Sequence, residues 1–166
     1  MFAAVCLALC MILPMITMNI PAIGNALSPM HIPVLLCGFI CGPWYGLAVG
    51  LIAPVMRSAL FGLPAMFPQA IAMSFELATY GLLTGILYRK LPKTVPMLYA
   101  ALILAMISGR IVWGAARAIL SGVSGSSFTW ALFFAGAFTN AIPGIILHIL
   151  LIPPVVLALK KAKIME

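Results

Sequence analysis

The chain has 166 residues, of which 65% are hydrophobic and 7% are charged, and its formal net charge is +7. A typical soluble domain is about 25% charged, so this composition leaves too few polar side chains to cover a water-facing surface. It excludes a soluble globular protein and indicates an integral membrane protein. The positive charge does not indicate a nucleic-acid-binding protein, because the basic residues are few and form no continuous stripe.

Three apolar segments occupy the first part of the chain, and each is a candidate span because about 20 apolar residues cross a bilayer. The first covers residues 2–20 and ends near Pro21. The second covers residues 31–42 and is short, so we expect a tilted or partial span. The third covers residues 45–62 and follows a Gly-Pro turn, which is typical of a break between helices.

Three further segments complete the chain, at residues 68–88, 94–120 and 129–159. Proline marks their boundaries and interrupts the last one, because proline removes a helical hydrogen bond. The prolines concerned are Pro64, Pro68, Pro92, Pro143, Pro153 and Pro154. We therefore predict an all-α integral membrane protein of six transmembrane helices, with residues 1–166 forming a single transmembrane domain.

Two basic clusters predict how the chain is oriented, because cytoplasmic loops of membrane proteins are enriched in Lys and Arg. The clusters are Arg89, Lys90 and Lys93 after the fourth segment, and Lys160, Lys161 and Lys163 after the sixth. Six spans place both clusters on one side, so both termini are predicted to be cytoplasmic. The outer loops are then residues 21–30, 61–68 and 121–128, and the last is rich in Gly and Ser, which is typical of a mobile loop.

Four charged residues fall inside the predicted spans, namely Arg57, Glu76, Arg110 and Arg117. Charge at this depth is costly, so such residues usually face the protein interior or a wet cavity. From the helical rise of 1.5 Å per residue, all four lie in the outer half of the bilayer. Helical spacing puts Trp113 on the face of Arg110 and Arg117, and Tyr80 on the face of Glu76.

These residues predict a binding pocket that opens outward. Three arginines against one glutamate leave about two positive charges without a partner, and a bound carboxylate or phosphate would compensate them. The alternative is that Arg57 and Arg117 reach the outer headgroups while Glu76 pairs with Arg110. Polar residues nearby are candidates for the same pocket: His31 and Asn25 at its mouth, in the first outer loop, and Asn140 inside it. His148, deeper in the sixth segment, is expected to be a packed and hydrogen-bonded histidine.

Small residues recur at helical spacing and predict close helix packing. Gly-x-x-x-Gly motifs occur at Gly46/Gly50 and Gly81/Gly85, and an Ala-x-x-x-Ala motif occurs at Ala4/Ala8. Cysteines also recur four residues apart, at Cys6/Cys10 and Cys37/Cys41. Neither cysteine pair has a neighbouring His or acid to complete a metal site, so we expect packing residues and no metal.

The stretch from Ser28 (SPMHIPVLLCGFICGPWYGLAVG) through Arg57 (RSALFG) to Glu76 (ELATYG) resembles the substrate-binding S component of an energy-coupling factor (ECF) vitamin transporter. The resemblance extends to length, six spans, the Gly-Pro turn and the Ala-x-x-x-Ala motif. It implies that the chain binds a vitamin from outside, docks through Ala4 and Ala8 on a transmembrane coupling subunit, and topples to release the vitamin inside. ATP would be hydrolysed by two partner ATPase subunits, with no cofactor in this chain. It also implies the plasma membrane of a prokaryote.

Pantothenate, a small carboxylate, fits the predicted arginine-rich pocket best among the vitamins of this family. Riboflavin, pyridoxine and folate are alternatives, whereas cationic thiamine fits poorly. Two functions of other classes also remain. One is a self-sufficient small-solute permease. The other is an intramembrane serine protease with Ser124 and His148, which the predicted separation of about 28 Å along the sixth helix opposes.

Overall fold

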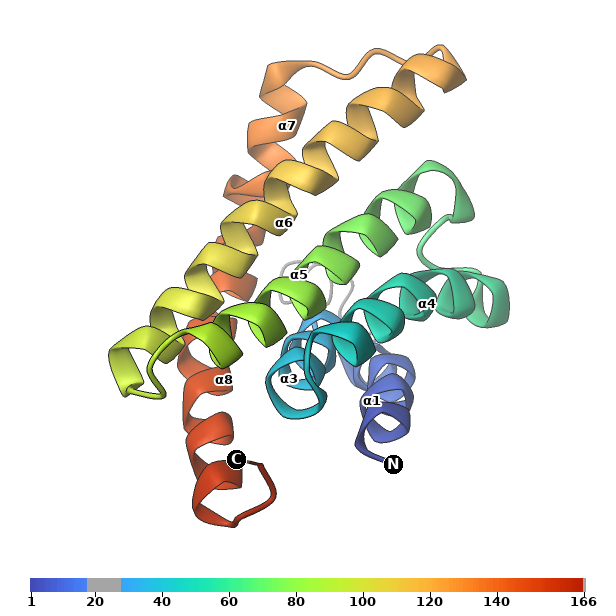
Figure 1. Cartoon of the computed structure of the whole chain (residues 1–166). Helices are drawn as coiled ribbons and strands as arrows, with labels where there is room; N and C mark the ends of the chain where they lie inside the picture. The colour runs from blue at the N-terminus through green and yellow to red at the C-terminus, as the bar shows by residue number, and fades with distance from the viewer. Residues whose placement is uncertain (18–27, 166) are drawn as a thin grey trace.

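The computed structural model of the chain describes residues 1–17 and 28–165, and these contain helices and no strand. The helices are α1 (Phe2–Thr17), α3 (His31–Cys41), α4 (Pro43–Phe61), α5 (Ile71–Lys90), α6 (Val95–Ser124), α7 (Trp130–Ala137) and α8 (Ile142–Lys161) (Figure 1). A π-helical turn, η1 (Met66–Ala70), leads into α5, and a 3-10 turn, η2 (Thr139–Ala141), joins α7 to α8.

The predicted all-helical fold with six helical segments is confirmed. Four segments are long and apolar enough to cross a membrane, namely Pro43–Phe61, Met66–Lys90, Val95–Ser124 and Trp130–Lys161. The other two, α1 and α3, are shorter apolar helices. As predicted, the second segment is short, because α3 has 11 residues.

Two boundaries differ from the prediction. Helix α6 continues to Ser124 instead of ending near residue 120, so half of the predicted loop 121–128 is helical. It ends at Gly125, whose φ of 70° is a left-handed conformation that glycine adopts without strain. The predicted interruption at Pro143 is confirmed, because the sixth segment breaks at η2 and Pro143 lies in the first turn of α8, where its missing N–H costs nothing. The predicted second interruption at Pro153 and Pro154 is wrong, because both prolines lie within α8 without ending it.

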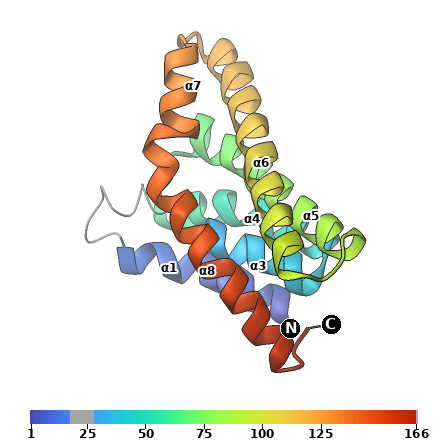
Figure 2. The same cartoon turned by 90° about the vertical axis from the view of Figure 1, so that its left-hand side faces the viewer.

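Helices α4 and α5 run side by side in close contact, as both views show (Figures 1 and 2). Glycines make this approach possible: a Cβ added to Gly46 would lie 2.5 Å from the carbonyl oxygen of Gly81. One turn further, a Cβ on Gly50 would collide with the backbone of Leu77. The predicted role of the two Gly-x-x-x-Gly motifs in helix packing is therefore confirmed.

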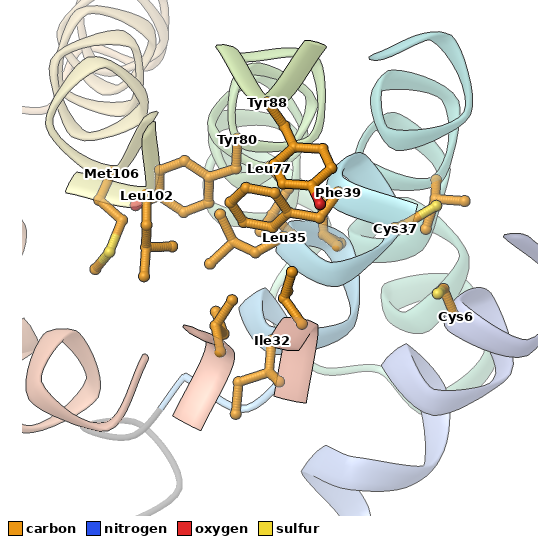
Figure 3. Packing of buried hydrophobic residues seen from close by; sticks show 14 of the residues in the cluster. Cys6, Ile32, Leu35, Cys37, Phe39, Leu77, Tyr80, Tyr88, Leu102 and Met106 are labelled. Carbon is orange, nitrogen blue, oxygen red and sulfur yellow. The ribbon is translucent and has the colours of Figure 1, made fainter. Parts of the chain in front are cut away.

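The hydrophobic core is centred on α3, which packs against α1, α4, α5 and α8. Leu35 of α3, Leu77 of α5 and Leu102 of α6 are fully buried there (Figure 3). Figure 3 also shows Cys6 of α1 beside Cys37 of α3, and both belong to this core. The cysteines thus act as packing residues at the contact between α1 and α3.

The N- and C-termini lie at the same end of the molecule in both views (Figures 1 and 2). At this end the Nζ of Lys160, in the last turn of α8, donates a hydrogen bond of 3.4 Å to the carbonyl oxygen of Lys93. The contact brings the two basic clusters together. The prediction that they share one face of the protein is confirmed.

Candidate functional site

A cavity of about 590 Å³ is lined by residues from each of the six helical segments. Its lining residues in α5 lie near the start of that helix, whereas the basic residues Arg89 and Lys90 lie at its other end. The wall combines apolar side chains with a set of polar and charged ones. Those with hydrogen-bonding side chains are Thr17, Ser28, His31, Arg57, Gln69, Glu76, Arg110, Trp113 and Asn140. Binding sites for small molecules usually have volumes of about 300–1,000 Å³ and a few convergent polar groups, so this cavity is the candidate substrate site.

Glu76 anchors the polar part of the wall. Its side chain is 1% exposed, and its Oε1 accepts a hydrogen bond of 2.7 Å from the Tyr80 hydroxyl. The Nη1 of Arg110 lies 3.1 Å from the same oxygen, and the Nε2 of His31 lies 3.5 Å from it. A carboxylate this deeply buried needs such compensation, because an isolated charge in a low-dielectric interior is strongly unfavourable.

Arg57 is buried at 3% exposure on the α4 side of the cavity. Its Nη1 donates a hydrogen bond of 2.9 Å to the carbonyl oxygen of Met11 in α1, and its guanidinium lies 5.3 Å from the centre of the Phe61 ring. These contacts hold the cation within the protein. The alternative in which Arg57 reaches the lipid headgroups is therefore wrong, whereas its other part, the pairing of Glu76 with Arg110, is observed.

Arg117 does not line the cavity but lies behind two residues that do. Its Nη1 donates a hydrogen bond of 3.1 Å to Oε1 of Gln69, and its guanidinium lies 6.0 Å from the ring centre of Trp113. The same guanidinium lies 6.0 Å from the ring centre of Phe128. Arg117 thus lies behind the cavity wall and supports it through its contacts with Gln69 and Trp113.

The two histidines lie together. His31 is the first residue of α3 instead of a loop residue, and its ring is stacked on that of His148 with the centroids 5.8 Å apart. His148 is 1% exposed, which agrees with the expected packed histidine. The backbone of Ser28 lies near the His148 ring, and neither ring nitrogen makes a hydrogen bond of standard geometry among the residues that the structure describes.

Six of the side chains predicted to bind substrate meet in the cavity wall: His31, Arg57, Glu76, Arg110, Trp113 and Asn140. Two others lie one layer behind it, Tyr80 on Glu76 and Arg117 on Gln69. Asn25, predicted at the mouth, lies outside the described residues. The predicted pocket is thus present as a cavity, built by residues far apart in the sequence.

A family model described as the substrate-specific component of the ECF transporter matches residues 1–156. The chain belongs to this family. No curated protein and no solved structure gives a significant match. Family members are substrate-binding subunits of a transport system with membrane coupling and ATPase partners, and they are not enzymes.

The charge in the cavity of this S component is smaller than the sequence suggested. Arg110 is paired with Glu76, and Arg117 lies outside the wall on Gln69. Two arginines and one glutamate remain among the described lining residues, which leaves one net positive charge when His31 is neutral. The lining residues therefore carry one surplus positive charge, where the sequence predicted two for the four charged residues.

Several lining residues of the S component were missed by the sequence reasoning. Gln69 was the easiest of them to predict from the sequence, because it is the only glutamine in the chain and falls within the predicted fourth span. Thr17, Ser28 and Gly136 carried no such signal, because small residues are common in membrane helices and loops. The charged lining residues were all predicted, whereas of the neutral ones Trp113 and Asn140 were predicted and Gln69, Thr17 and Ser28 were not.

The residues of the protease alternative do not form a catalytic pair in this S component. The Oγ of Ser124 lies 3.0 Å from the Oγ of Ser126, at the exposed end of α6. His148 is instead buried against His31. The nucleophile and base of a serine protease must approach hydrogen-bond distance, and this pair does not.

Proposed function

We propose that this S component captures a small water-soluble vitamin with an anionic group, and that pantothenate is the first candidate. The observation that carries the proposal is the single net positive charge of the cavity, where Arg57 is buried beside neutral hydrogen-bonding groups. A guanidinium matches a carboxylate in charge and shape. One carboxylate would therefore neutralise the cavity.

The composition of the wall also supports a small, partly polar ligand. Arg57 and Arg110 both line the cavity, and either guanidinium is a candidate for the contact with the anion. Asn140 and Gln69 add amide groups that suit the hydroxyl or amide oxygens of a vitamin, and Trp113 adds an apolar surface. Riboflavin, pyridoxine and folate remain alternatives, whereas a cationic ligand such as thiamine would be repelled.

The proposed orientation places both termini in the cytoplasm of a prokaryotic cell, with the protein in the plasma membrane. The two basic clusters share one face, and cytoplasmic faces of membrane proteins are enriched in Lys and Arg. The cavity's lining residues in α5 lie at the opposite end of that helix from Arg89 and Lys90, so the vitamin would enter from outside.

The proposed docking surface for the coupling subunit is the outer face of α1. Ala4 and Ala8 are exposed there, while Cys6 and Cys10 on the opposite face are buried. Small exposed residues let another helix approach closely. Docking through this face would allow the S component to topple in the bilayer while the partner ATPases hydrolyse ATP.

Uptake of radiolabelled pantothenate tests this function against a self-sufficient permease. Cells would express the chain alone or with a coupling subunit and two ATPases, and liposomes would contain the purified chain alone. We expect uptake only with the complete transporter. Equal uptake by the chain alone in liposomes would support the permease instead.

A further inference from the structure

Gln69 is a lining residue of the cavity whose side-chain oxygen is bound by an arginine that does not line it. It lies in η1, lines the cavity, and accepts a hydrogen bond of 3.1 Å at Oε1 from Nη1 of Arg117. The Arg117 guanidinium also lies beside the ring pair of Trp113 and Phe128, at 6.0 Å from each ring centre, and the two ring centres are 6.4 Å apart. The guanidinium is thus fixed by contacts that do not involve the ligand.

The chemistry of this contact determines which way the amide faces. A guanidinium can only donate hydrogen bonds, so the Gln69 atom next to Arg117 must be the amide oxygen. The amino group, with its two N–H donors, is the part left for the cavity. Asn140 differs, since its side chain makes no hydrogen bond within the described part of the chain, and it can present either its oxygen or its nitrogen.

We propose that Gln69 is a specificity-determining residue whose amide N–H donates to a carboxylate or carbonyl oxygen of the substrate, and that Arg117 is the positioning residue that sets this orientation. The inference rests on the proposed function. Gln69 would be a second residue in contact with the ligand besides Arg57 or Arg110. The ligand would then need a hydrogen-bond acceptor next to the Gln69 amide. A ligand with only an N–H donor there would face another donor and lose affinity.

The role of Arg117 also follows from its distance from the cavity. Arg117 is absent from the cavity wall, so it acts on the ligand through Gln69. Replacement of Arg117 by Met keeps an apolar chain against Trp113 and Phe128 but removes the donor that fixes the amide. Gln69 would then be free to rotate, and its N–H groups would face the cavity only part of the time.

A double-mutant cycle measured by calorimetry tests the inference, with pantothenate and the other vitamins of the panel as probes. The variants are Gln69→Met, Arg117→Met and the double variant, with Arg89→Met as a charge-matched control at the exposed end of α5. We expect each single variant to weaken binding about 10-fold to 100-fold. The double variant should bind within about threefold of Gln69→Met, because Arg117 has no route to the ligand once Gln69 is gone.

A second variant separates ligand contact from structural support. Gln69→Glu keeps an acceptor for Arg117 but has no N–H, so it should retain the thermal stability of the wild type and still lose binding. Wild-type affinity in Gln69→Met or Gln69→Glu would overturn the role of Gln69. Multiplying losses in the double variant would overturn the positioning role of Arg117.

Vitamin binding to the wild-type protein tests the proposed function, and its comparison with the Gln69 variants tests the role of Gln69. If no vitamin binds to the wild-type protein, both the proposed function and this inference are overturned. If a vitamin binds to the wild type and equally to the Gln69 variants, the function stands and the inference alone is overturned.

Discussion

Glu76 of α5 and Arg110 of α6 form a buried ion pair, with Oε1 and Nη1 3.1 Å apart in the wall of the cavity. The pair joins the two helices at the point where the ligand is proposed to bind. It also explains how a protein with few acids places one of them in the membrane, since the opposite charge and the Tyr80 hydroxyl compensate it.

Replacement of Arg110 by Ala is expected to weaken ligand binding, because it removes the net positive charge of the cavity. It should also lower the free energy of unfolding by about 3–5 kcal/mol, because Glu76 is left as an uncompensated buried charge. Thermal unfolding in detergent and calorimetric titration measure the two effects. The double variant Arg110→Ala/Glu76→Gln should recover much of the stability and part of the binding, because Arg57 then restores the net positive charge of the cavity. Ligand affinity equal to that of the wild type in Arg110→Ala would contradict the role given to this arginine.

Replacement of Tyr80 by Phe removes a hydrogen bond to a charged group and should lower the free energy of unfolding by about 1.5–3 kcal/mol. The matched control is Tyr88→Phe, because the Tyr88 ring packs at 5.4 Å against Phe39 and its hydroxyl has no hydrogen bond within the described residues. Equal stability losses in the two variants would show that the hydroxyl of Tyr80 does not support Glu76.

The glycine contact between α4 and α5 predicts that Gly81→Ala is strongly destabilising, by about 1–3 kcal/mol or more, because the added methyl group meets the backbone of Gly46. Gly122→Ala in α6 is the control, since nothing lies within 4 Å of the added Cβ. It should leave stability unchanged or raise it slightly. A tolerated Gly81→Ala would mean that the two helices are further apart.

The exposed small-residue face of α1 predicts that Ala8→Trp prevents assembly with the coupling subunit while ligand binding is retained. Copurification from detergent-solubilised membranes measures assembly. The control is Ile111→Trp on α6, where the wild-type side chain is 58% exposed and lies on another helix. Normal copurification of Ala8→Trp would remove α1 from the docking surface.

Much of the fold could be predicted because each apolar segment and each proline or glycine break acts locally. Pro143 and Gly125 show the limit, since the end of a helix depends on where the chain finds its last hydrogen bonds. The predicted loop at 121–128 was therefore too long.

The site could be predicted only in part. Buried charges such as Glu76 and Arg110 indicate a site because their cost in a membrane demands an explanation. The partners of Arg57 and Arg117 could not be predicted, because Met11 and Gln69 are brought to them by tertiary packing over 46 and 48 residues of chain. Burying a neutral amide costs less free energy than burying a charge, so an amide in a predicted span is a weaker indication of a site.

The central claim is that this S component binds an anionic vitamin in the cavity around Arg57 and Glu76. Calorimetric titration of the purified protein with a vitamin panel headed by pantothenate tests it most directly, with riboflavin, pyridoxine and folate as alternatives and thiamine as the cationic comparison. The account predicts submicromolar binding of one anionic vitamin and no binding of thiamine. Tight binding of thiamine, tight binding of the neutral vitamins riboflavin or pyridoxine, or no binding across the panel would contradict it.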